Sequence, residues 1–338
     1  MKCLRNLHIP EGIIKLIEYW YNNQYVSVRF NGTLSDEWKI KNGVRQGGIL
    51  SGLFFSLYIN DVINKVNKQN IGCKMGIINC NLIAYADDMV IMSPSYKGLQ
   101  MLLNIVYNEL DSIGLKINTN KTKCMIFRSK KKVDQYDIKP FNINGNDIDF
   151  VSTFKYLGFI INEKMNDSDD IDRAKKKFYS DFNVMIRNFH FTDKTVKIFL
   201  LKQYCIQFYG VDLWINVDNS KNAIKQFGIG YHKAIKKLLN LSYHESNHFA
   251  CQEANMLIFD HLINKNKLMS VYRLLMNPPN IIEKIKTYFY ITSVYINRIF
   301  ELFKSKYEIN DIMDNDCEAL IARIQYVQNH ERQLRLTV

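Results

Sequence analysis

The sequence predicts an α+β fold, in which an antiparallel sheet with helices is followed by a mainly helical half. Three observations predict it. Glycines and turn-forming pairs are concentrated in the first 165 residues. In the same part, segments with helical spacing of apolar residues alternate with hairpin-like segments. From about residue 170 glycine becomes scarce, and helical spacing dominates to the end of the chain.

The first elements follow from the periodicity of apolar residues. Residues 12–22 (GIIKLIEYWYN) carry them at helical spacing, which predicts a helix. Apolar and polar residues then alternate over 25–40 on both sides of Asn31-Gly32, the strongest short signal for a β-hairpin. Helical spacing returns over 51–66, so a second helix is expected there.

The next elements are shorter. Residues 82–93 form two apolar arms around a polar pair, which indicates a β-hairpin with that pair at its tip. A helix is expected over 96–113, because Gly114 is a typical helix stop. The remaining expectations are strands over 115–118 and 123–127, a hairpin over 141–151 around Asn144-Gly145, and a strand-like segment over 154–161.

Charge and composition restrict the class of protein. Lys and Arg number 45 against 33 Asp and Glu, a net charge of +12 that favours a polyanionic partner such as nucleic acid. A hydrophobic content of 47% excludes wholesale disorder. The sequence has neither an apolar run of about 18 residues that could span a membrane nor a secretory signal. Seven scattered cysteines favour a reducing compartment, the nucleus or cytoplasm.

The residues best suited to chemistry lie in Tyr85-Ala86-Asp87-Asp88. Two adjacent carboxylates at a tight turn between buried strands are costly unless something positive meets them. Mg²⁺ fits this need, because it takes hard oxygen ligands and usually binds one or two carboxylates together with substrate phosphates. A two-metal site for phosphoryl transfer has the same requirement. The alternative is an ordinary hairpin turn, since Asp is common in turns.

A second candidate is the loop at residues 44–51 (VRQGGILS), between a hairpin and a helix. Gly47 and Gly48 would let the backbone approach a bulky ligand closely. Ser51 could cap the following helix, whose N-terminus suits a phosphate. The alternative is a plain Gly-Gly turn before a helix.

In chain order, these segments form a specific series of motifs. They are GVRQGGILSGLFFSLYIND, YADD, GLKINTNKTKCMIF and FKYLGFII. Their order and spacing resemble the reverse transcriptase domain of non-LTR (LINE-type) retrotransposons over residues 1 to about 165. The resemblance continues more loosely over 201–214 and 233–255, which look like the region after the polymerase core of such elements.

The resemblance implies an RNA-directed DNA polymerase that adds dNTPs to a DNA primer on an RNA template, with Mg²⁺ or Mn²⁺. It implies three regions, whose first boundary we place in the acidic, glycine-free stretch 162–170. They are a partial palm (1–165), a helical, basic, thumb-like region (166–275) and a helical C-terminal region (276–338).

The resemblance also implies roles for single residues. Asp87 would be a metal-binding catalytic carboxylate, and Asp88 its neighbour with a supporting role in catalysis and metal binding. Lys121 matches the lysine suggested to protonate or neutralise the leaving pyrophosphate. The residues that match nucleotide- and template-binding positions are Arg45, Gln46, Gly47 and Gly48, with Tyr85 and Ala86 along the path of the primer end. The residues that match the hairpin gripping the primer strand are Phe154, Lys155, Tyr156, Leu157 and Gly158.

Two departures from the family pattern matter. Gly52 stands where the family usually has a proline, so the rigid helix start that proline supplies is lost. In the family, the first catalytic motif, with its own metal-binding Asp, precedes a segment resembling KCLRNLHIP. That motif would lie before Met1, so the chain as given is expected to be inactive. Asp36 and Glu37 are not expected to substitute, because they lie on the far arm of a hairpin. The alternative function is a non-catalytic, nucleic-acid-binding remnant of a mobile element.

The other candidate sites have simpler explanations. His244, His248 and Cys251 have the spacing of zinc ligands, but without an evident fourth ligand a structural role is favoured. Cys73 and Cys80 make a weaker metal pair. Trp214 is expected in the core. Basic clusters that could follow a phosphate backbone are Lys130 to Lys132, Arg173 with Lys175 to Lys177, and Lys233 with Lys236 and Lys237; the interleaved aromatic residues are Phe178, Tyr179 and Phe182.

Overall fold

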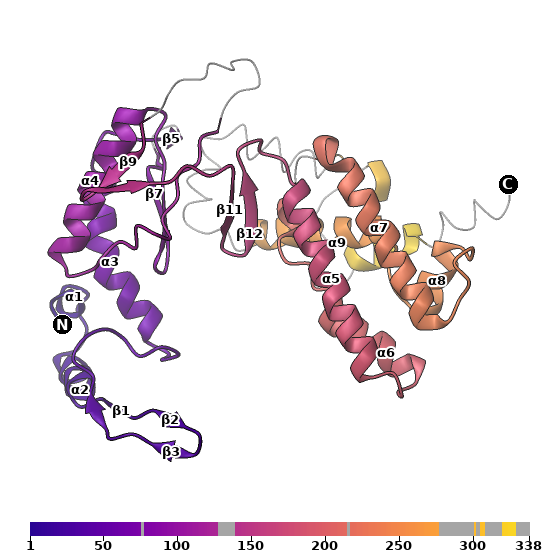
Figure 1. The fold of residues 1–338 in the computed structure, drawn as a ribbon, viewed down its shortest axis with the longest axis horizontal. Helices are drawn as coiled ribbons and strands as arrows, with labels where there is room; N and C mark the ends of the chain where they lie inside the picture. Colours follow the sequence, from indigo (N-terminus) through magenta and orange to yellow (C-terminus); the bar gives the residue numbers. More distant parts are fainter. Residues whose placement is uncertain are drawn as a thin grey trace. The chain divides into compact units, whose positions relative to one another are not determined.

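A computed structural model describes residues 1–75, 78–127, 139–214, 217–276, 301, 305–307 and 320–328 (Figure 1). It combines helices with small antiparallel two-stranded sheets, which confirms the predicted α+β class. The chain divides into two compact units, residues 1–119 with 141–147 and residues 120–140 with 148–338. The Lys130 to Lys132 cluster and Cys317 lie outside the described residues.

The first unit begins with two helices and four short strands, and the expected helix and hairpin are confirmed. The turn residues Asn31 and Gly32 both have positive φ values, 50° and 85°, as the short hairpin turn requires. Little of this segment is buried, since Ile14 is the sole buried residue of the second helix. The elements are α1 (Lys2–Asn6), α2 (Glu11–Asn22), β1 (Tyr25–Val26), β2 (Arg29–Phe30), β3 (Thr33–Leu34) and β4 (Trp38–Lys39).

Two helices, α3 (Ser51–Asn67) and α4 (Tyr96–Ser112), form the core of the first unit. Ser95 caps α4 by accepting a hydrogen bond from the Gly98 backbone N–H at 3.1 Å. The helix ends before Gly114, as predicted. The buried residues that α3, α4 and the strand that begins at Leu82 between them contribute are Val62, Val66, Leu82, Leu102, Val106 and Leu110.

The strands of the first unit form separate hairpins. The predicted hairpin around Asn144-Gly145 is confirmed, and its backbone is tied to α4 through two hydrogen bonds between Gln100 and Asn142, 2.7 and 3.0 Å long. The strands are β5 (Lys74–Met75), β6 (Ile78–Asn79), β7 (Leu82–Tyr85), β8 (Asp88–Ile91), β9 (Phe141–Ile143) and β10 (Asn146–Ile148).

The strands predicted at 115–118 and 123–127 are wrong. Leu115 and Ile117 alternate because they pack on the α3 and α4 core, and no strand pairs with them in the described part of the chain. In the second segment, an isolated parallel bridge joins Cys124 to Phe150. Residues 123–126 are all partly buried, so the apolar run there belongs to an irregular segment.

The described part of the second unit is mainly helical, as predicted from about residue 170. A hairpin of β11 (Thr153–Tyr156) and β12 (Phe159–Asn162) precedes the helices. The longest helices, α5 and α7, pack against each other. The helical elements are α5 (Ser168–Asn188), α6 (Lys194–Leu200), the π-helical turn η1 (Leu201–Cys205), the 3₁₀ turn η2 (Val211–Leu213), α7 (Val217–Leu239), α8 (Asn247–Glu253) and α9 (Phe259–Met276).

Aromatic side chains dominate the core of this unit. Trp214, Phe227 and Tyr231 are completely buried, and the ring of Phe178 lies within 6.1 Å of five other aromatic rings. The expected burial of Trp214 is therefore confirmed. None of the helices in the described residues is both long and apolar enough to cross a membrane. The boundary expected near residue 165 stays a prediction.

Candidate functional site

The predicted carboxylate pair lies at the tip of a β-hairpin whose turn has two residues. Strands β7 and β8 pair with Tyr85 opposite Asp88, so Ala86 and Asp87 form the turn. Ala86 has a φ of 51°, a left-handed conformation that costs free energy in any residue with a Cβ atom. Asp87 and Asp88 are both exposed. The hairpin tip therefore presents two adjacent carboxylates to solvent on a strained turn.

The base of the same hairpin is anchored in the first unit. Leu82 is buried in the core, and Asn81, just before β7, is completely buried. The Asn81 side-chain amide donates to the carbonyl oxygens of Val66, at 3.0 Å, and Ile71, at 3.2 Å. Gly72 is packed so closely against Asn81 that there is no room for a side chain, because an added Cβ would lie 2.5 Å from the Asn81 Cβ. The base is thus fixed to the end of α3.

The chemistry of this tip suits a hard divalent cation. None of the ion pairs among the described residues includes Asp87 or Asp88. The four carboxylate oxygens are ligands of the type that Mg²⁺ prefers. The described residues contain no group of three or more His, Cys, Asp or Glu side chains arranged for a metal. The tip therefore supplies part of a coordination sphere, which Mg²⁺ commonly completes with waters and substrate phosphates.

The loop before α3 has its own internal geometry. Arg45, Gln46 and Gly47 are exposed, and Gly47 has a φ of 80°. Gly48 is required by packing, since an added Cβ would lie 2.6 Å from the Ser51 Oγ. The exposed guanidinium of Arg45 is thus presented on a loop whose shape depends on glycine at two positions.

The expected capping role of Ser51 is wrong. Ser51 is the first residue of α3, and Leu50 occupies the N-cap position. The Ser51 hydroxyl donates to the carbonyl oxygen of Arg45 at 2.6 Å, so it braces the loop instead of capping the helix.

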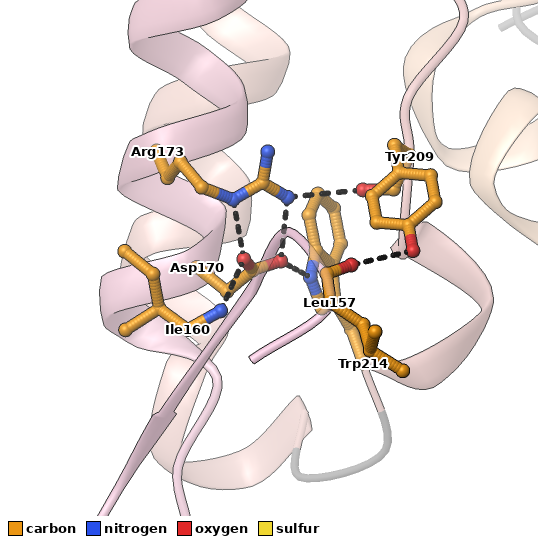
Figure 2. A network of polar contacts seen from close by, with 6 residues as sticks. All are labelled: Leu157, Ile160, Asp170, Arg173, Tyr209 and Trp214. Atoms are coloured by element: carbon orange, nitrogen blue, oxygen red, sulfur yellow. Dashed lines mark hydrogen bonds and ion pairs between the residues drawn. The ribbon is translucent and has the colours of Figure 1, made fainter. Parts of the chain in front are cut away.

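The residues expected at the primer strand form the β11–β12 hairpin of the second unit. Leu157 and Gly158 make its turn, with φ values of 46° and 83°. Phe154 and Lys155 are exposed, whereas Tyr156 is partly buried. The Tyr209 hydroxyl donates to the Leu157 carbonyl oxygen at 2.6 Å (Figure 2).

The predicted site residues are therefore divided between the two units. The first unit contains the loop at 45–48 and the tip at 85–88. The second unit contains Lys121, which is exposed, and the hairpin at 154–158. The roles assigned to these residues stay predictions.

The basic cluster of α5 is largely paired within its own helix. Carboxylate partners lie 2.6 Å from Arg173, 2.7 Å from Lys175 and 2.5 Å from Lys177. The prediction that aromatic residues here interleave with the cations on the surface is wrong for Phe178 and Phe182. Both are buried in the core, because they lie on the apolar face of the helix.

The remaining candidates differ in exposure. Lys236 is buried and donates to the Tyr243 carbonyl oxygen at 3.1 Å, whereas Lys233 and Lys237 are exposed. Cys251 is completely buried in the aromatic core, and burial raises the pKa of its thiol to about 12. Cys251 thus contributes to packing.

Sequence reasoning missed three residues that shape these hairpins: Asn81, Asp170 and Tyr209. Asn81 stands between apolar residues without any distinguishing motif. Asp170 belongs to an acidic stretch that predicts an exposed boundary, yet its side chain is completely buried. Tyr209 is one of many tyrosines. The roles of all three depend on contacts with residues distant in the sequence, which the sequence alone does not reveal.

Comparison with known proteins agrees with the resemblance to reverse transcriptases. The family model described as reverse transcriptase (RNA-dependent DNA polymerase) matches residues 1–161. Over 160 residues, 46% of the chain, there is 29% identity to the retrovirus-related Pol polyprotein from type-2 retrotransposable element R2DM of Drosophila melanogaster, of which 15% is covered.

Two other relatives match longer segments. The type-1 retrotransposable element R2 polyprotein of Nasonia vitripennis is 27% identical over 186 residues, which cover 52% of this chain and 18% of that protein. The RNA-directed DNA polymerase from mobile element jockey of Drosophila funebris is 24% identical over 215 residues, which cover 59% of this chain and 23% of that protein. The chain thus spans less than a quarter of the length of each of these three relatives. Residues 1–161, with the hairpin that carries Asp87 and Asp88, therefore match the reverse transcriptase family and are similar to the polyproteins of these retrotransposable elements.

Proposed function

We propose that this chain acts in Mg²⁺-dependent addition of deoxynucleotides to a DNA primer paired with an RNA template. Residues 1–165 would act as a partial palm, 166–275 as a thumb-like region and 276–338 as a helical C-terminal region. The observation that carries the proposal is the pair of exposed carboxylates at the tip of the strained β7–β8 turn. A strained backbone is costly, and such conformations are concentrated at functional sites.

Asp87 and Asp88 are the residues that would hold the metal. Their oxygens fit Mg²⁺, and Mn²⁺ as a substitute, because both ions accept carboxylate ligands. A bound divalent ion would supply electrostatic stabilisation of the attacking and leaving oxygens during phosphoryl transfer. The base of the hairpin, through Asn81 and Leu82, attaches the strands that carry the two carboxylates to the α3 and α4 core.

The residues around the carboxylates would bind the substrates. The guanidinium of Arg45, which has five N–H donors, suits a nucleotide phosphate or a base edge. Gln46, Gly47 and Gly48 would place the backbone of the same loop against the template base and the incoming dNTP. Tyr85 and Ala86 would border the primer end, and the ammonium group of Lys121 would meet the leaving pyrophosphate.

The β11–β12 hairpin would contact the primer strand. Its exposed residues Phe154 and Lys155 offer a ring for stacking and a cation for the phosphate backbone. Tyr156, Leu157 and Gly158 would form the supporting end of the same hairpin.

Iron-directed cleavage of the chain tests the metal site without requiring polymerase activity. Fe²⁺ replaces Mg²⁺, and ascorbate with hydrogen peroxide then produces hydroxyl radicals that cut the backbone near the bound ion. With an RNA–DNA template–primer and dNTP present, we expect a cut within a few residues of Asp87. Excess Mg²⁺ should suppress it, because the two ions compete for the same oxygens.

Matched variants decide the result. Asp87→Asn with Asp88→Asn should abolish the cut. Asp36→Asn with Glu37→Gln removes an adjacent, exposed acidic pair from the segment between β3 and β4 of the same unit, and should leave the cut unchanged. A cut near residue 87 that survives the first double substitution, or the absence of any cut there in the parent chain, would overturn the proposed metal site.

A further inference from the structure

The carboxylate of Asp170 joins three separate segments of the second unit. It is completely buried in the first turn of α5. One oxygen, Oδ1, accepts from the Ile160 backbone N–H at 3.0 Å and from the Arg173 Nε at 2.6 Å. The other, Oδ2, accepts from the Arg173 Nη2 at 3.1 Å and from the Trp214 Nε1 at 2.9 Å (Figure 2).

This arrangement meets the physical conditions for burying a charge. A buried carboxylate costs several kcal/mol unless an opposite charge and hydrogen bonds meet both oxygens. Here four N–H groups donate to the two carboxylate oxygens. Two of them belong to the Arg173 guanidinium, which binds the carboxylate in a bidentate manner. Such a network orients its members strictly, because each donor that loses the carboxylate is left unpaired in the interior.

A second layer of contacts extends from Arg173 to the tip of the hairpin. The Arg173 Nη2 donates to the Tyr209 carbonyl oxygen at 3.0 Å, and the Tyr209 hydroxyl donates to the Leu157 carbonyl oxygen at 2.6 Å (Figure 2). Gly158 is fitted to the same ring, since an added Cβ would lie 3.1 Å from the Tyr209 Cε1. The turn at Leu157 and Gly158 is therefore in direct contact with Tyr209, in the segment between η1 and η2 of the same unit.

The attachment is on β12, across the hairpin from the two residues that we assign to the primer. Ile160, whose N–H is held by Asp170, is paired across the hairpin with Lys155. Lys155 and its neighbour Phe154 are exposed. Fixing Ile160 from one side therefore fixes the orientation of two exposed side chains on the partner strand.

We propose that Asp170 is a positioning residue for primer binding. Through Ile160 on one side, and through Arg173 and Tyr209 on the other, it holds the β11–β12 hairpin so that Phe154 and Lys155 meet the primer strand in one register. The inference rests on the primer-binding role given to this hairpin under the proposed function. It assigns the control of that register to a residue that never touches nucleic acid.

Hydrogen exchange of the Ile160 amide tests the attachment directly. Asp170→Asn removes the charge and places an amide N–H among donors, so the Ile160 amide should exchange at least tenfold faster than in the parent chain. Asp172→Asn is the matched control, because it removes a charge two residues along α5 from a surface pair with Lys175. It should leave the rate unchanged. An unchanged rate in Asp170→Asn would overturn the proposal.

A milder variant guards against general loss of structure. Tyr209→Phe removes one hydroxyl from a side chain that is 61% exposed, so the aromatic core should remain folded. The full chain, with a photoreactive benzoylphenylalanine in place of Phe154, is then cross-linked to a DNA primer on an RNA template. In the parent we expect cross-links at one or two primer positions; Tyr209→Phe and Asp170→Asn should each spread them over more positions or lower their yield at least fivefold.

The outcomes separate this inference from the proposed function. Asp172→Asn should give the parental cross-links. Parental cross-links in both Asp170→Asn and Tyr209→Phe would overturn the positioning role. A parent that does not cross-link through residue 154 at all would instead contradict primer binding by the hairpin, and with it the register role, while the exchange rate of the Ile160 amide would still report the attachment by Asp170.

Discussion

The hairpins β7–β8 and β11–β12 have the same local design but are fastened at opposite ends. Each has two four-residue strands, a two-residue turn and a turn residue with a side chain at positive φ, 51° for Ala86 and 46° for Leu157. The first is anchored at its base by Asn81 and Leu82, and its tip is exposed. The second is held at its tip by Tyr209 and along its outer strand by Asp170.

This difference in anchoring determines what Asp87 and Asp170 can each do. Asp87 lies in solvent without an ion pair among the described residues, so its charge is available to a ligand. Asp170 is buried and uses both oxygens within the fold. An exposed charge contributes little to stability, whereas a buried and paired charge becomes indispensable once its partners are fixed. The predictions below test this contrast.

The largest expected effect on stability is the difference between these two aspartates. Asp170→Ala should lower the free energy of unfolding of the second unit by about 3–5 kcal/mol, because Arg173 and the Trp214 N–H lose their buried partner. Asp87→Ala should change the free energy of unfolding of the first unit by less than about 0.5 kcal/mol. Urea unfolding followed by tryptophan fluorescence measures the effect of Asp170→Ala, since Trp214 is completely buried in the second unit while Trp20 and Trp38 are exposed. Hydrogen exchange of the β7 and β8 amides measures the effect of Asp87→Ala. Similar values for the two variants would break the comparison.

How far the sequence predicts these hairpins depends on where their determinants lie. Asn31-Gly32 and Asn144-Gly145 mark hairpins correctly, because positive φ values are a local demand that these residues meet. The tip at Asp87 is also predictable, since its apolar arms are adjacent to it. Asp170 is not, because its partner Trp214 lies 44 residues away.

Two wrong predictions have the same origin. Residues 115–118 alternate like a strand, but tertiary packing on α3 and α4 accounts for their pattern. Serine is a residue type that commonly caps helices, but the helix begins one residue earlier than a capping role for Ser51 requires. The Ser51 hydroxyl instead donates to the carbonyl oxygen of Arg45. Local patterns identify candidates for burial or capping, and the partner decides which structure forms.

The next largest effect should come from mild acid. It should lower the stability of the second unit, which holds the β11–β12 hairpin, and so distinguish that hairpin from β7–β8. Burial lowers the pKa of His232 to about 4, against an ordinary 6.5, with repulsion from Lys236 and His248 adding to the effect and Asp260 opposing it. Its Nε2 accepts from the Phe259 backbone N–H at 3.3 Å, at the start of α9, so only the neutral ring can make this bond. The folded state therefore binds the proton less readily than the unfolded state.

The sign follows from that difference. Stability present above pH 6.5 is lost as the pH falls from 6.5 towards 4, by at most about 3 kcal/mol. Urea unfolding of the second unit at pH 7 and pH 5 should show the loss, and the Ile160 amide should exchange faster at pH 5 after correction for intrinsic rates. His232→Gln does not titrate and should lose most of the dependence between pH 6.5 and 5. Equal dependence in the variant would contradict this account.

The base of the first hairpin should give an intermediate effect. Asn81→Ala leaves the carbonyl oxygens of Val66 and Ile71 without their side-chain donor in a buried position, at a cost of about 1–3 kcal/mol. Hydrogen exchange of the β7 and β8 amides should accelerate accordingly. Asn108→Ala, at an exposed position of α4, is the matched control and should leave these amides unchanged. Slow exchange in Asn81→Ala would show that Leu82 alone anchors the base.

The smallest effect concerns the strain at the tip, and its sign is opposite to that of an ordinary alanine-to-glycine change. Ala86 pays about 1–2 kcal/mol for its left-handed φ, whereas glycine adopts that conformation freely. Glycine also gives the unfolded chain more freedom, about 0.5–1 kcal/mol, so Ala86→Gly should stabilise the hairpin by about 1 kcal/mol or less. Ala223→Gly, inside α7, should instead destabilise its helix by about 1 kcal/mol. Slower exchange of the β8 amides in Ala86→Gly, beside faster exchange within α7 in Ala223→Gly, would confirm that the tip is strained; faster exchange in both would show that Ala86 is relaxed in its turn.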